Sequence, residues 1–388
     1  MKGYQTHTQT GILLNANEAS QNVDDKIKQE ILDAISNLAF NRYPDTTCHE
    51  LHDLYANIMN VPSSWILSGN GSDQMLGFLI QYYVQGNKTL YTLAPDFSMY
   101  DYYVELNHAK IEKFETSLDG SFDVDTFISN GKNKKVDMIL FSNPNNPTGH
   151  AISKSEMIQI CEAFSNIPVI FDEAYMEFAK GSGVDPQDLR PLNKLKLVAG
   201  STLALTGKYS NFMCLRTFSK AYGLAGLRVG YAVGSAGIMR VLGKTLLPYH
   251  VNAWSLAVAE EVYRQKDLYK EQLETIIEQR DLMREQLEQM GLKIWPSATN
   301  FLTCCPQGEL TARLVAACEQ QYGSQGEKTQ QMLAGMYLYR KLLEKKILVR
   351  DYTSHPVLQG CLRITVGLPL ENAEIISQLQ RLCGEEAI

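Results

Sequence analysis

Lys220 has the surroundings that a covalent catalyst needs. It lies in the segment 216–231, where small, hydroxyl-bearing and apolar residues flank it. Apolar surroundings desolvate an amine and lower its pKa, and the neutral amine can attack a carbonyl carbon to form an imine. The segment therefore predicts a lysine nucleophile.

The same segment carries residue types that bind phosphate. Thr217 and Ser219 provide hydroxyl donors, and Arg228 provides a guanidinium fork eight positions after the lysine. An imine-forming lysine beside a phosphate-binding group is what pyridoxal phosphate (PLP) requires. On these residues alone, a surface loop that leads into a strand is the alternative interpretation, so the rest of the chain has to decide.

Short apolar segments alternate with amphipathic ones over the first two thirds of the chain. This alternation of strand and helix predicts an α/β fold, with a large domain built on a mostly parallel, doubly wound sheet. We expect strands at residues 65–67, 89–93, 135–142, 168–171, 213–216 and 229–233, and helices at residues 23–38, 48–60 and 153–165 and from the turn at 68–73 to about residue 83.

Residues that suit ligand binding follow several of these strands. The glycine-rich turn at 68–73 ends in Ser72 and Asp73 and offers free backbone N–H groups at a helix N-terminus, where anions bind. The next three strands are followed by Phe97, by Asn146, and by Asp172 with Tyr175. Open α/β sheets bind their ligands at the carboxyl ends of strands.

The last third of the chain predicts a second, smaller α/β unit. A long helical pattern at 252–290 could bridge two domains, and the strands expected at 347–350 and 361–366 carry Arg350 and Arg363. We divide the chain into an N-terminal arm at 1–40 that is part of the small domain, a large PLP-binding domain at 41–265 and a C-terminal small domain at 266–388.

The composition excludes several classes of function. The 388 residues carry a net charge of -7 and contain no dense Lys/Arg run, which argues against nucleic-acid and membrane-surface binding. The N-terminus has no signal-peptide pattern, and no apolar run is long enough to span a bilayer. We expect a soluble, cytoplasmic protein.

The eight cysteines show no C-x-x-C spacing, and the histidines show no metal-ligand pattern, so no metal site is expected. Cys304 and Cys305 are adjacent in an expected strand, where successive side chains point to opposite faces. Reduced and mostly buried thiols are the expected state.

PLP catalysis needs a carboxylate beside the pyridine nitrogen, hydrogen-bond donors to the ring 3-oxygen and an aromatic side chain over the ring. Residues of these types occur in order along the chain. Together with the lysine segment they resemble the fold-type I PLP aminotransferases, and within them most of all the histidinol-phosphate aminotransferases. The resemblance rests on motifs at residues 14–18, 41–44, 69–73, 216–231, 347–351 and 362–367, so it covers nearly the whole chain.

The resemblance implies roles for the cofactor-site residues. Lys220 would hold the cofactor as an imine and move the substrate Cα proton, and Asp172 would pair with the ring nitrogen. Tyr175 and Asn146 would bond the 3-oxygen, and Phe97 would stack on the ring. The phosphate would be held by the backbone amides of Ser72 and Asp73 and by the side chains of Thr217, Ser219 and Arg228.

The resemblance also implies a homodimer, because Tyr43 matches a residue that reaches the phosphate from the partner subunit. Arg363 would bind the anionic end of the substrate, with Arg350, Asn17 and Tyr4 as further substrate-binding residues. A structural ion pair is the alternative for Arg363.

The implied reaction exchanges an amino group between glutamate and imidazole-acetol phosphate, reversibly giving histidinol phosphate. The partners are thus small amino acids and 2-oxo acids.

The sequence departs from the family pattern at several places. The segments 190–212 and 306–335 are longer than is usual in the family, Gln74 replaces an acidic residue, and Phe97 replaces a commoner tyrosine. The guanidinium fork suits phosphate and carboxylate alike. An aminotransferase for an aromatic or other amino acid and a PLP lyase like threonine-phosphate decarboxylase are therefore the alternatives. A ligand sensor within a DNA-binding regulator is disfavoured, because no basic module fits in the first 40 residues.

Overall fold

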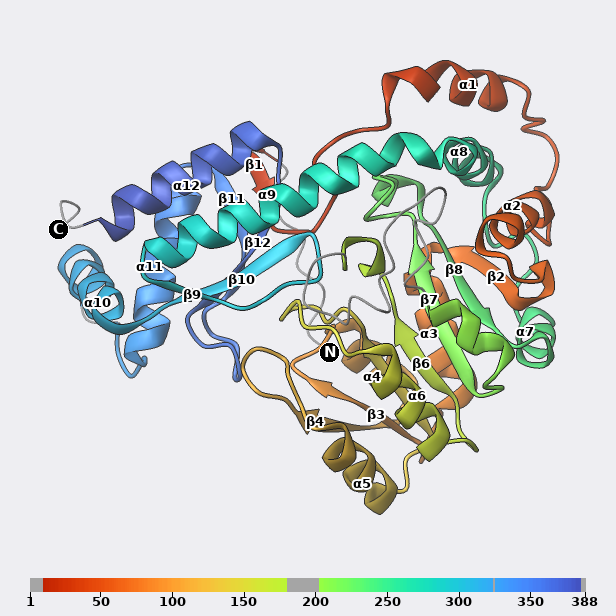
Figure 1. Cartoon of the computed structure of the whole chain (residues 1–388), viewed down its shortest axis with the longest axis horizontal. Coiled ribbons are helices and arrows are strands. Elements are labelled where there is room, and N and C mark those ends of the chain that lie inside the picture. The colour runs from red at the N-terminus through yellow and green to blue at the C-terminus, as the bar shows by residue number, and fades with distance from the viewer. Residues whose placement is uncertain (1–9, 180–201, 324, 385–388) are drawn as a thin grey trace.

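The computed structural model describes residues 10–179, 202–323 and 325–384, which form a large and a small α/β domain (Figure 1). The long helix α9 (Tyr269–Gln289) extends from the large domain along the small one (Figure 1). Tyr4 and most of the segment 190–212 lie outside the described residues.

The described part of the large domain is built on a seven-stranded sheet with the order β2-β8-β7-β6-β5-β3-β4. β3 to β7 pair in parallel, and β8 is antiparallel to both of its neighbours. The carboxyl ends of β2, β3, β5, β6 and β7 and the start of β8 therefore lie along one edge. The strands are β2 (Ile66–Asn70), β3 (Thr89–Ala94), β4 (Lys110–Glu115), β5 (Met138–Ser142), β6 (Val169–Asp172), β7 (Phe212–Thr217) and β8 (Val229–Gly234).

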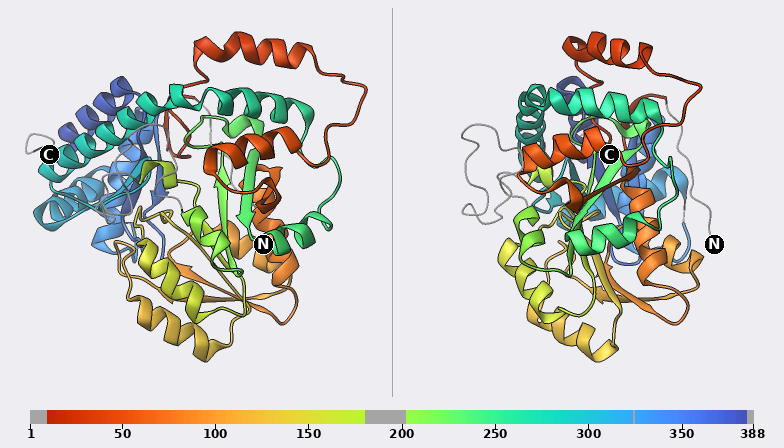
Figure 2. Two further views of the ribbon diagram at one scale, coloured as in Figure 1. Left: turned by 45° about the vertical axis from the view of Figure 1, so that its right-hand side comes forward. Right: turned by 90° about the vertical axis from the view of Figure 1, so that its right-hand side faces the viewer.

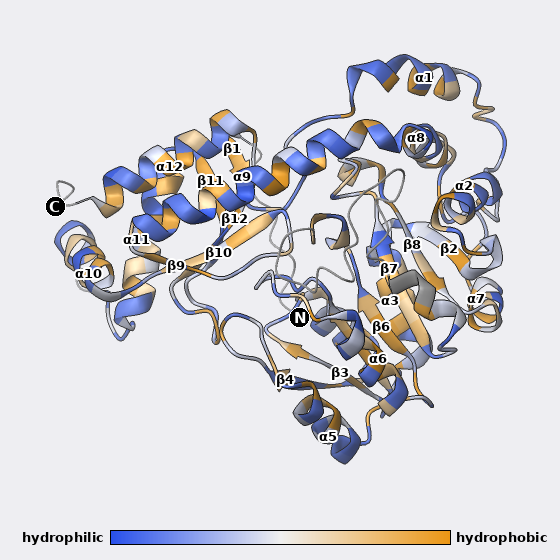
Figure 3. Cartoon of the chain, viewed as in Figure 1, coloured by the Kyte–Doolittle hydropathy of each residue, from blue (hydrophilic) through white to orange (hydrophobic). Residues whose placement is uncertain are grey.

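Helices cover both faces of this sheet, so the predicted doubly wound fold is confirmed. Alternate strand residues such as Leu140 and Met213 share a core with α3 (Gly71–Tyr83), α4 (Met99–Leu106) and α7 (Ala236–Gly243). Their neighbours Phe141 and Cys214 share the other core with α2 (His49–Met59), α5 (Val124–Lys134), α6 (Lys154–Ala163) and α8 (Ala253–Arg264). Figure 3 shows these strands as the apolar centre between helices with polar outer faces.

The small domain combines the two ends of the described chain. Its sheet has the order β1-β11-β12-β10-β9, with β1 parallel to β11 and the other pairs antiparallel. The strands are β1 (Ile12–Leu14), β9 (Leu292–Ile294), β10 (Phe301–Pro306), β11 (Ile347–Tyr352) and β12 (Cys361–Thr365), accompanied by α9, α10 (Gly308–Tyr322), α11 (Gln330–Glu344) and α12 (Pro369–Cys383).

The structure departs from the sequence-based elements in two places. The continuous helix expected at 252–290 is wrong: a 3₁₀ turn at Lys266–Leu268 separates α8 from α9. The direction has to change there, because α8 packs on α1 (Asp25–Ser36) and α2 whereas α9 crosses to the small domain (Figure 2). The prediction also missed β4, a mostly charged edge strand with only two apolar residues, its flanking helices α4 and α5, and the short elements β1 and α7.

Among the described residues, no helix is both long and apolar enough to cross a lipid bilayer.

A buried ion pair joins the ends of β6 and β7. Arg216 on β7 is 1% exposed, and its Nε donates to Glu173 Oε2 at 2.7 Å while Nη1 donates to Glu177 Oε1 at 3.0 Å. Glu173 follows Asp172 directly, and Thr217 follows Arg216. The pair thus holds together the two chain segments that carry predicted cofactor residues.

Arg216→Ala would leave two buried carboxylates without their cation. We expect the free energy of unfolding, measured by urea denaturation, to fall by about 3–5 kcal/mol. Arg264→Ala is the matched control, because its ion pair with Glu50 is solvent-exposed and should contribute less than about 1 kcal/mol. Equal losses for the two variants would contradict the structural role of Arg216.

Candidate active site

A cavity of about 680 Å³ opens at the carboxyl edge of the large sheet, between the two domains. Most residues predicted from the sequence line it. They are Asn17, Ser72, Asp73, Phe97, Asn146, Asp172, Tyr175, Thr217, Ser219, Lys220, Arg228, Arg350 and Arg363. The strand ends account for this convergence, since parallel strands direct the residues that follow them to the same edge.

Lys220 lies just beyond β7 and projects its amine into the cavity. Nζ donates to the backbone oxygen of Ala16 at 3.0 Å and lies 5.9 Å from the centre of the Tyr175 ring. Burial, and then the nearby charge of Arg363, lower the pKa of Lys220 to about 8. The uncharged form, which a nucleophile or base requires, is therefore much more populated near neutral pH than for an ordinary lysine with a pKa of about 10.4.

Asp172, the last residue of β6, is a buried carboxylate in the same cavity. Tyr100 on α4 donates its hydroxyl to Asp172 Oδ2 at 3.1 Å, and the backbone N–H of Ala174 lies 3.3 Å from Oδ1. Burial raises the pKa of Asp172 to about 6, although the hydrogen bond from Tyr100 opposes this shift. A positively charged group bound beside this carboxyl would stabilise its charged form.

The turn from β2 into α3 forms a cradle of backbone and side-chain donors. Arg228, at the start of β8, donates through Nη2 to Asp73 Oδ2 at 2.9 Å, and a hydrogen bond of 2.9 Å links the hydroxyls of Thr217 and Ser219. The side chain of the N-cap residue Asn70 makes no capping hydrogen bond, so the N–H groups of the first turn of α3 are available to a ligand.

Two glycines keep this cradle open. A Cβ at Gly230 would lie 2.3 Å from the Ser72 nitrogen, and one at Gly71, where φ is +78°, would lie 2.6 Å from Arg228 Nη2. Side chains at these positions would occupy the space between the turn and the guanidinium. The local sequence therefore preserves a concave site lined by donors, which suits a phosphate.

Arg363 on β12 carries a positive charge into the cavity from the small domain. Its Nη1 donates to Asn146 Oδ1, its Nη2 donates to the Asn15 oxygen at 2.9 Å, and its guanidinium lies 5.0 Å from the Phe301 ring centre. Nε is buried and has no hydrogen-bond partner among the described residues. Because Arg363 lines the cavity, this donor is available to an acceptor atom of a ligand bound there.

Arg350 lies directly opposite Arg363 in the antiparallel pair of β11 and β12. Side chains of directly opposed strand residues lie on the same face of the sheet, so an anion bound there can interact with both guanidiniums. Tyr352 on β11 also lines the cavity, with its ring centre 5.8 Å from the Arg363 guanidinium.

Asn17 connects the N-terminal segment to the cavity. It is buried with φ of +54°, and its Nδ2 donates to the Tyr175 hydroxyl at 3.0 Å. Burial raises the pKa of Tyr175 to about 12, against the lowering effects of Arg363 and Asn17. The phenol therefore keeps its proton and can donate it to a ligand oxygen.

Tyr43 does not join the cavity of its own chain. Its side chain is 80% exposed and stacks on Tyr249 at 4.3 Å between ring centres. Tyr4, the other predicted residue absent from the cavity lining, lies outside the described residues.

Sequence reasoning missed the hydrogen-bonded group of the partly buried Asp96 with the buried Ser142 and Tyr100. Asp96 accepts hydrogen bonds from the Ser142 hydroxyl and from the Phe97 nitrogen at 2.8 Å, and the Ser142 hydroxyl accepts from the Asn146 nitrogen at 3.0 Å. Burial raises the pKa of Asp96 to about 8 despite these bonds. The position of Asp96 directly before Phe97, at a strand end, was the available signal.

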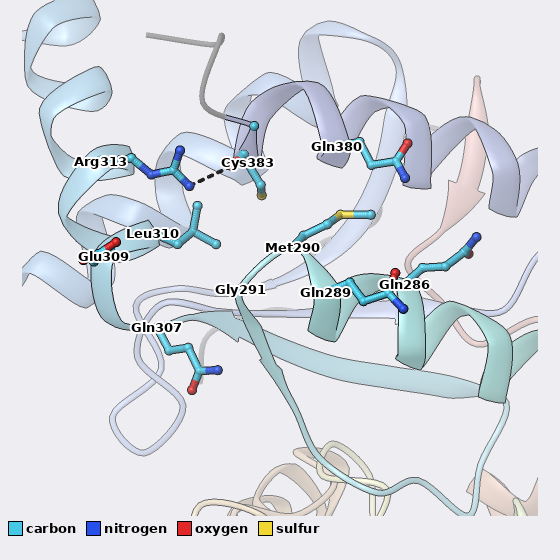
Figure 4. Close-up of a pocket in the computed structure, with 11 residues that line it drawn as sticks. Gln286, Gln289, Met290, Gly291, Gln307, Glu309, Leu310, Arg313, Gln380 and Cys383 are labelled. Atoms are coloured by element: carbon cyan, nitrogen blue, oxygen red, sulfur yellow. Dashed lines mark hydrogen bonds between the residues drawn. The ribbon is translucent and has the colours of Figure 1, made fainter.

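A second cavity, of about 650 Å³, lies at the far end of the small domain among α9, α10 and α12 (Figure 4). Several glutamines line it, and Arg313 donates to the Cys383 oxygen at 2.8 Å. Its lining contains neither a lysine nor any of the predicted site residues. The cavity beside Lys220 is therefore the candidate active site.

The fold and the cavity agree with the family to which the sequence is assigned. Residues 9–378 match the family model for aminotransferase class I and II, and the chain belongs to this family.

Individual relatives extend the comparison. The chain is 30% identical over 367 residues to histidinol-phosphate aminotransferase from Clostridium novyi, covering 94% of this chain and 90% of that protein. Its structure is similar to that of histidinol-phosphate aminotransferase from Clostridium acetobutylicum, with a TM-score of 0.77 at 20% identity, covering 95% and 98% of the two chains. It is also similar to the Sinorhizobium meliloti enzyme in complex with pyridoxal-5'-phosphate, with a TM-score of 0.74 at 21% identity over 96% and 90% of the chains.

Asp96→Asn tests the burial of the Asp96 carboxyl. The folded-state pKa of about 8 exceeds the unfolded value of about 3.9, so the folded protein keeps a proton that the unfolded chain has released. Asp96 therefore reduces stability progressively as the pH rises from about 4 to about 8. We therefore expect the thermal midpoint of Asp96→Asn minus that of the unaltered protein to increase steadily from about pH 5 to about pH 8.

The measurement uses cofactor-free protein, so that ligand binding does not contribute. Asp101→Asn is the control, because Asp101 is partly exposed and paired with Lys113. A difference between Asp96→Asn and the unaltered protein that is constant with pH would contradict the raised pKa.

Proposed function

We propose that the protein is a PLP-dependent aminotransferase that transfers an amino group between glutamate and imidazole-acetol phosphate, forming histidinol phosphate. The observation that carries this proposal is the arrangement in one cavity of the Lys220 amine, the buried Asp172 carboxylate and the paired arginines 350 and 363. The named relatives, histidinol-phosphate aminotransferases, support the choice of substrate.

The residues present fit PLP. The cradle kept open by Gly71 and Gly230 has the donors that a phosphate needs. Lys220 provides an amine for the aldehyde of the cofactor, and Asp172 provides a carboxylate for its ring nitrogen. Ser72, Asp73, Thr217, Ser219 and Arg228 would hold the phosphate, and Phe97, which also lines the cavity, would cover the ring.

Bound PLP supplies an electron-withdrawing ring that stabilises negative charge at the substrate Cα. The residues of the chain hold the groups around that carbon. With the cofactor bound, the Asp172 carboxylate would keep a proton on the ring nitrogen, the Tyr175 hydroxyl and the Asn146 amide would donate to the ring 3-oxygen, and Lys220 Nζ would be placed to move the Cα proton. The lowered pKa of Lys220 provides the neutral amine that this step uses.

Arg363 and Arg350 bind the anionic part of the substrate. Both guanidiniums enter from the small-domain sheet, and the buried Nε of Arg363 can donate to a phosphate or carboxylate oxygen. Asn17 holds the Tyr175 hydroxyl in place and belongs to the same wall. Glutamate and histidinol phosphate both present an anion at one end, so one arginine pair can bind both substrates in turn.

A homodimer would complete the site. Two exposed aromatic pairs join the segments around residues 40–43 and 249–254: Tyr43 stacks on Tyr249, and Phe40, which is 70% exposed, has its ring centre 5.8 Å from that of Trp254. Exposed apolar groups of this kind favour burial against a second subunit. We place Tyr43 in the partner's cofactor site, where its hydroxyl would reach the phosphate.

The reaction is tested on purified protein loaded with PLP. Glutamate, histidinol phosphate, phenylalanine and threonine phosphate are added separately, and the visible absorbance of the bound cofactor and the products are followed. We expect amino transfer from glutamate and histidinol phosphate, and none by Lys220→Ala. Arg363→Ala should lower kcat/KM for histidinol phosphate at least about 30-fold, the equivalent of about 2 kcal/mol. Transfer from phenylalanine alone, or carbon dioxide release from threonine phosphate, would overturn the substrate assignment.

Co-expression of Lys220→Ala and Tyr43→Ala chains tests the shared site. A mixed dimer would contain one site with both residues intact, so random pairing should restore about a quarter of the unaltered activity. The two variants expressed separately are the controls. A mixture that only averages the activities of the two variants, or a monomeric protein in ultracentrifugation, would contradict the shared site.

A further inference from the structure

Cys305 and Cys361 meet across two strands of the small-domain sheet. In the antiparallel pair of β10 and β12, Thr303 lies opposite Arg363 and Cys304 lies opposite Leu362. The next pair in this register is Cys305 with Cys361. Directly opposed residues of antiparallel strands have Cα atoms about 4.5 or 5.5 Å apart, and disulfides span about 4.4–6.8 Å. The backbone therefore permits a disulfide between them.

The adjacent cysteine points the other way. Cys304 belongs to the main core under the helices, whereas Cys361 forms a separate small core with Trp295 and Leu358, on which Cys305 packs. Of the adjacent cysteines 304 and 305, only Cys305 is partly exposed, and Cys304 is buried. The reactive partner of Cys305 is thus distant in the sequence.

The surroundings of the two thiols shift their pKa values in opposite directions. A hydrogen bond with Cys361, helped by the charge of Lys293, lowers the pKa of Cys305. Lys293 lies opposite Cys305 on β9. The same bond with Cys305, together with burial, raises the pKa of Cys361. A partly exposed, easily ionised thiol beside a buried, protonated one is the arrangement of an attacking and a resolving cysteine.

We propose that Cys305 and Cys361 form a reversible redox site, in which small-molecule disulfides oxidise the pair to a cross-strand disulfide. The assignment rests on the strand register, the separate small core and the partial exposure of Cys305, and it is independent of the aminotransferase reaction.

The chemistry is two successive thiol–disulfide exchanges. The Cys305 thiolate attacks one sulfur of the small-molecule disulfide, which breaks the S–S bond, releases one small thiolate and leaves a mixed disulfide on Cys305. Cys361 then loses its proton, and its sulfur attacks Cys305 Sγ and releases the second small thiolate. Two protein thiols are oxidised, one small-molecule disulfide is reduced to two thiols, and the two protons are taken up by the released thiolates.

The site adjoins the substrate-binding wall. Cys361 is two residues from Arg363 on β12 and lies opposite Tyr352 on β11. The disulfide would cross-link β10 and β12 at the end of the sheet that carries these cavity residues.

Oxidised glutathione is the probe for the test. The full chain, first reduced and freed of reductant, is incubated with it, and intact mass and peptide mapping identify the products. We expect an intramolecular disulfide between Cys305 and Cys361 that dithiothreitol reverses, together with a rise in the thermal midpoint. Cys361→Ser should stop at one glutathione on Cys305, and Cys305→Ser should acquire neither modification.

Cys304→Ala is the matched control, because Cys304 is adjacent in sequence but faces the other core; it should oxidise like the unaltered protein. Iodoacetamide labelling of the native protein gives a second readout that needs no variant, and Cys305 should react before Cys304. Three results would overturn the proposal: no disulfide, a disulfide that joins other cysteines, or equal labelling of Cys304 and Cys305.

Discussion

The ion pair of Arg216 with Glu173 and Glu177 is the interaction on which the candidate site depends. It joins the end of β6, which carries Asp172, to the end of β7, which leads to Lys220. Separating the charges of a pair this deeply buried is costly, because it leaves an unpaired charge away from water. The ion pair therefore restricts movement of the two strand ends relative to each other. It thus helps to fix the relative positions of the strand ends that bring the Asp172 carboxylate and the Lys220 amine into one cavity.

The two domains contribute different chemistry to this cavity. The large sheet provides the lysine, the carboxylate and the anion cradle, all at strand ends, whereas the small sheet provides Arg350 and Arg363 from within its strands. Hydrogen bonds between Arg363 and Asn146 and between Asn17 and Tyr175 join the cavity residues of the small domain to those of the large domain. A movement of the small domain would consequently shift the two arginines relative to the cradle around Ser72 and Arg228, while leaving that cradle intact.

The sequence predicted the residues whose role follows from local position, because a residue just past a parallel strand must lie at the sheet edge. Lys220 and Asp172 belong to this group. It did not predict Asp96, whose raised pKa results from the packing around it, or the break between α8 and α9, which arises because the chain passes from one domain to the other. The adjacency of Cys304 and Cys305 was visible, but the partner of Cys305 depends on the β10–β12 register, which no local pattern encodes.

The parallel pairing of β1 with β11 has a consequence for biosynthesis. Ile12 lies beside Ile347, so the residues that enter the cavity next, Ala16 and Asn17, are anchored by a strand made late in translation. Pairing between such distant segments delays folding, because the intervening chain must first be ordered. The central sheet can form while the chain is still emerging from the ribosome, but the wall formed by the early segment can close only after β11 has been synthesised. A nascent chain halted before that strand would hold its lysine in a half-built, solvent-filled cavity.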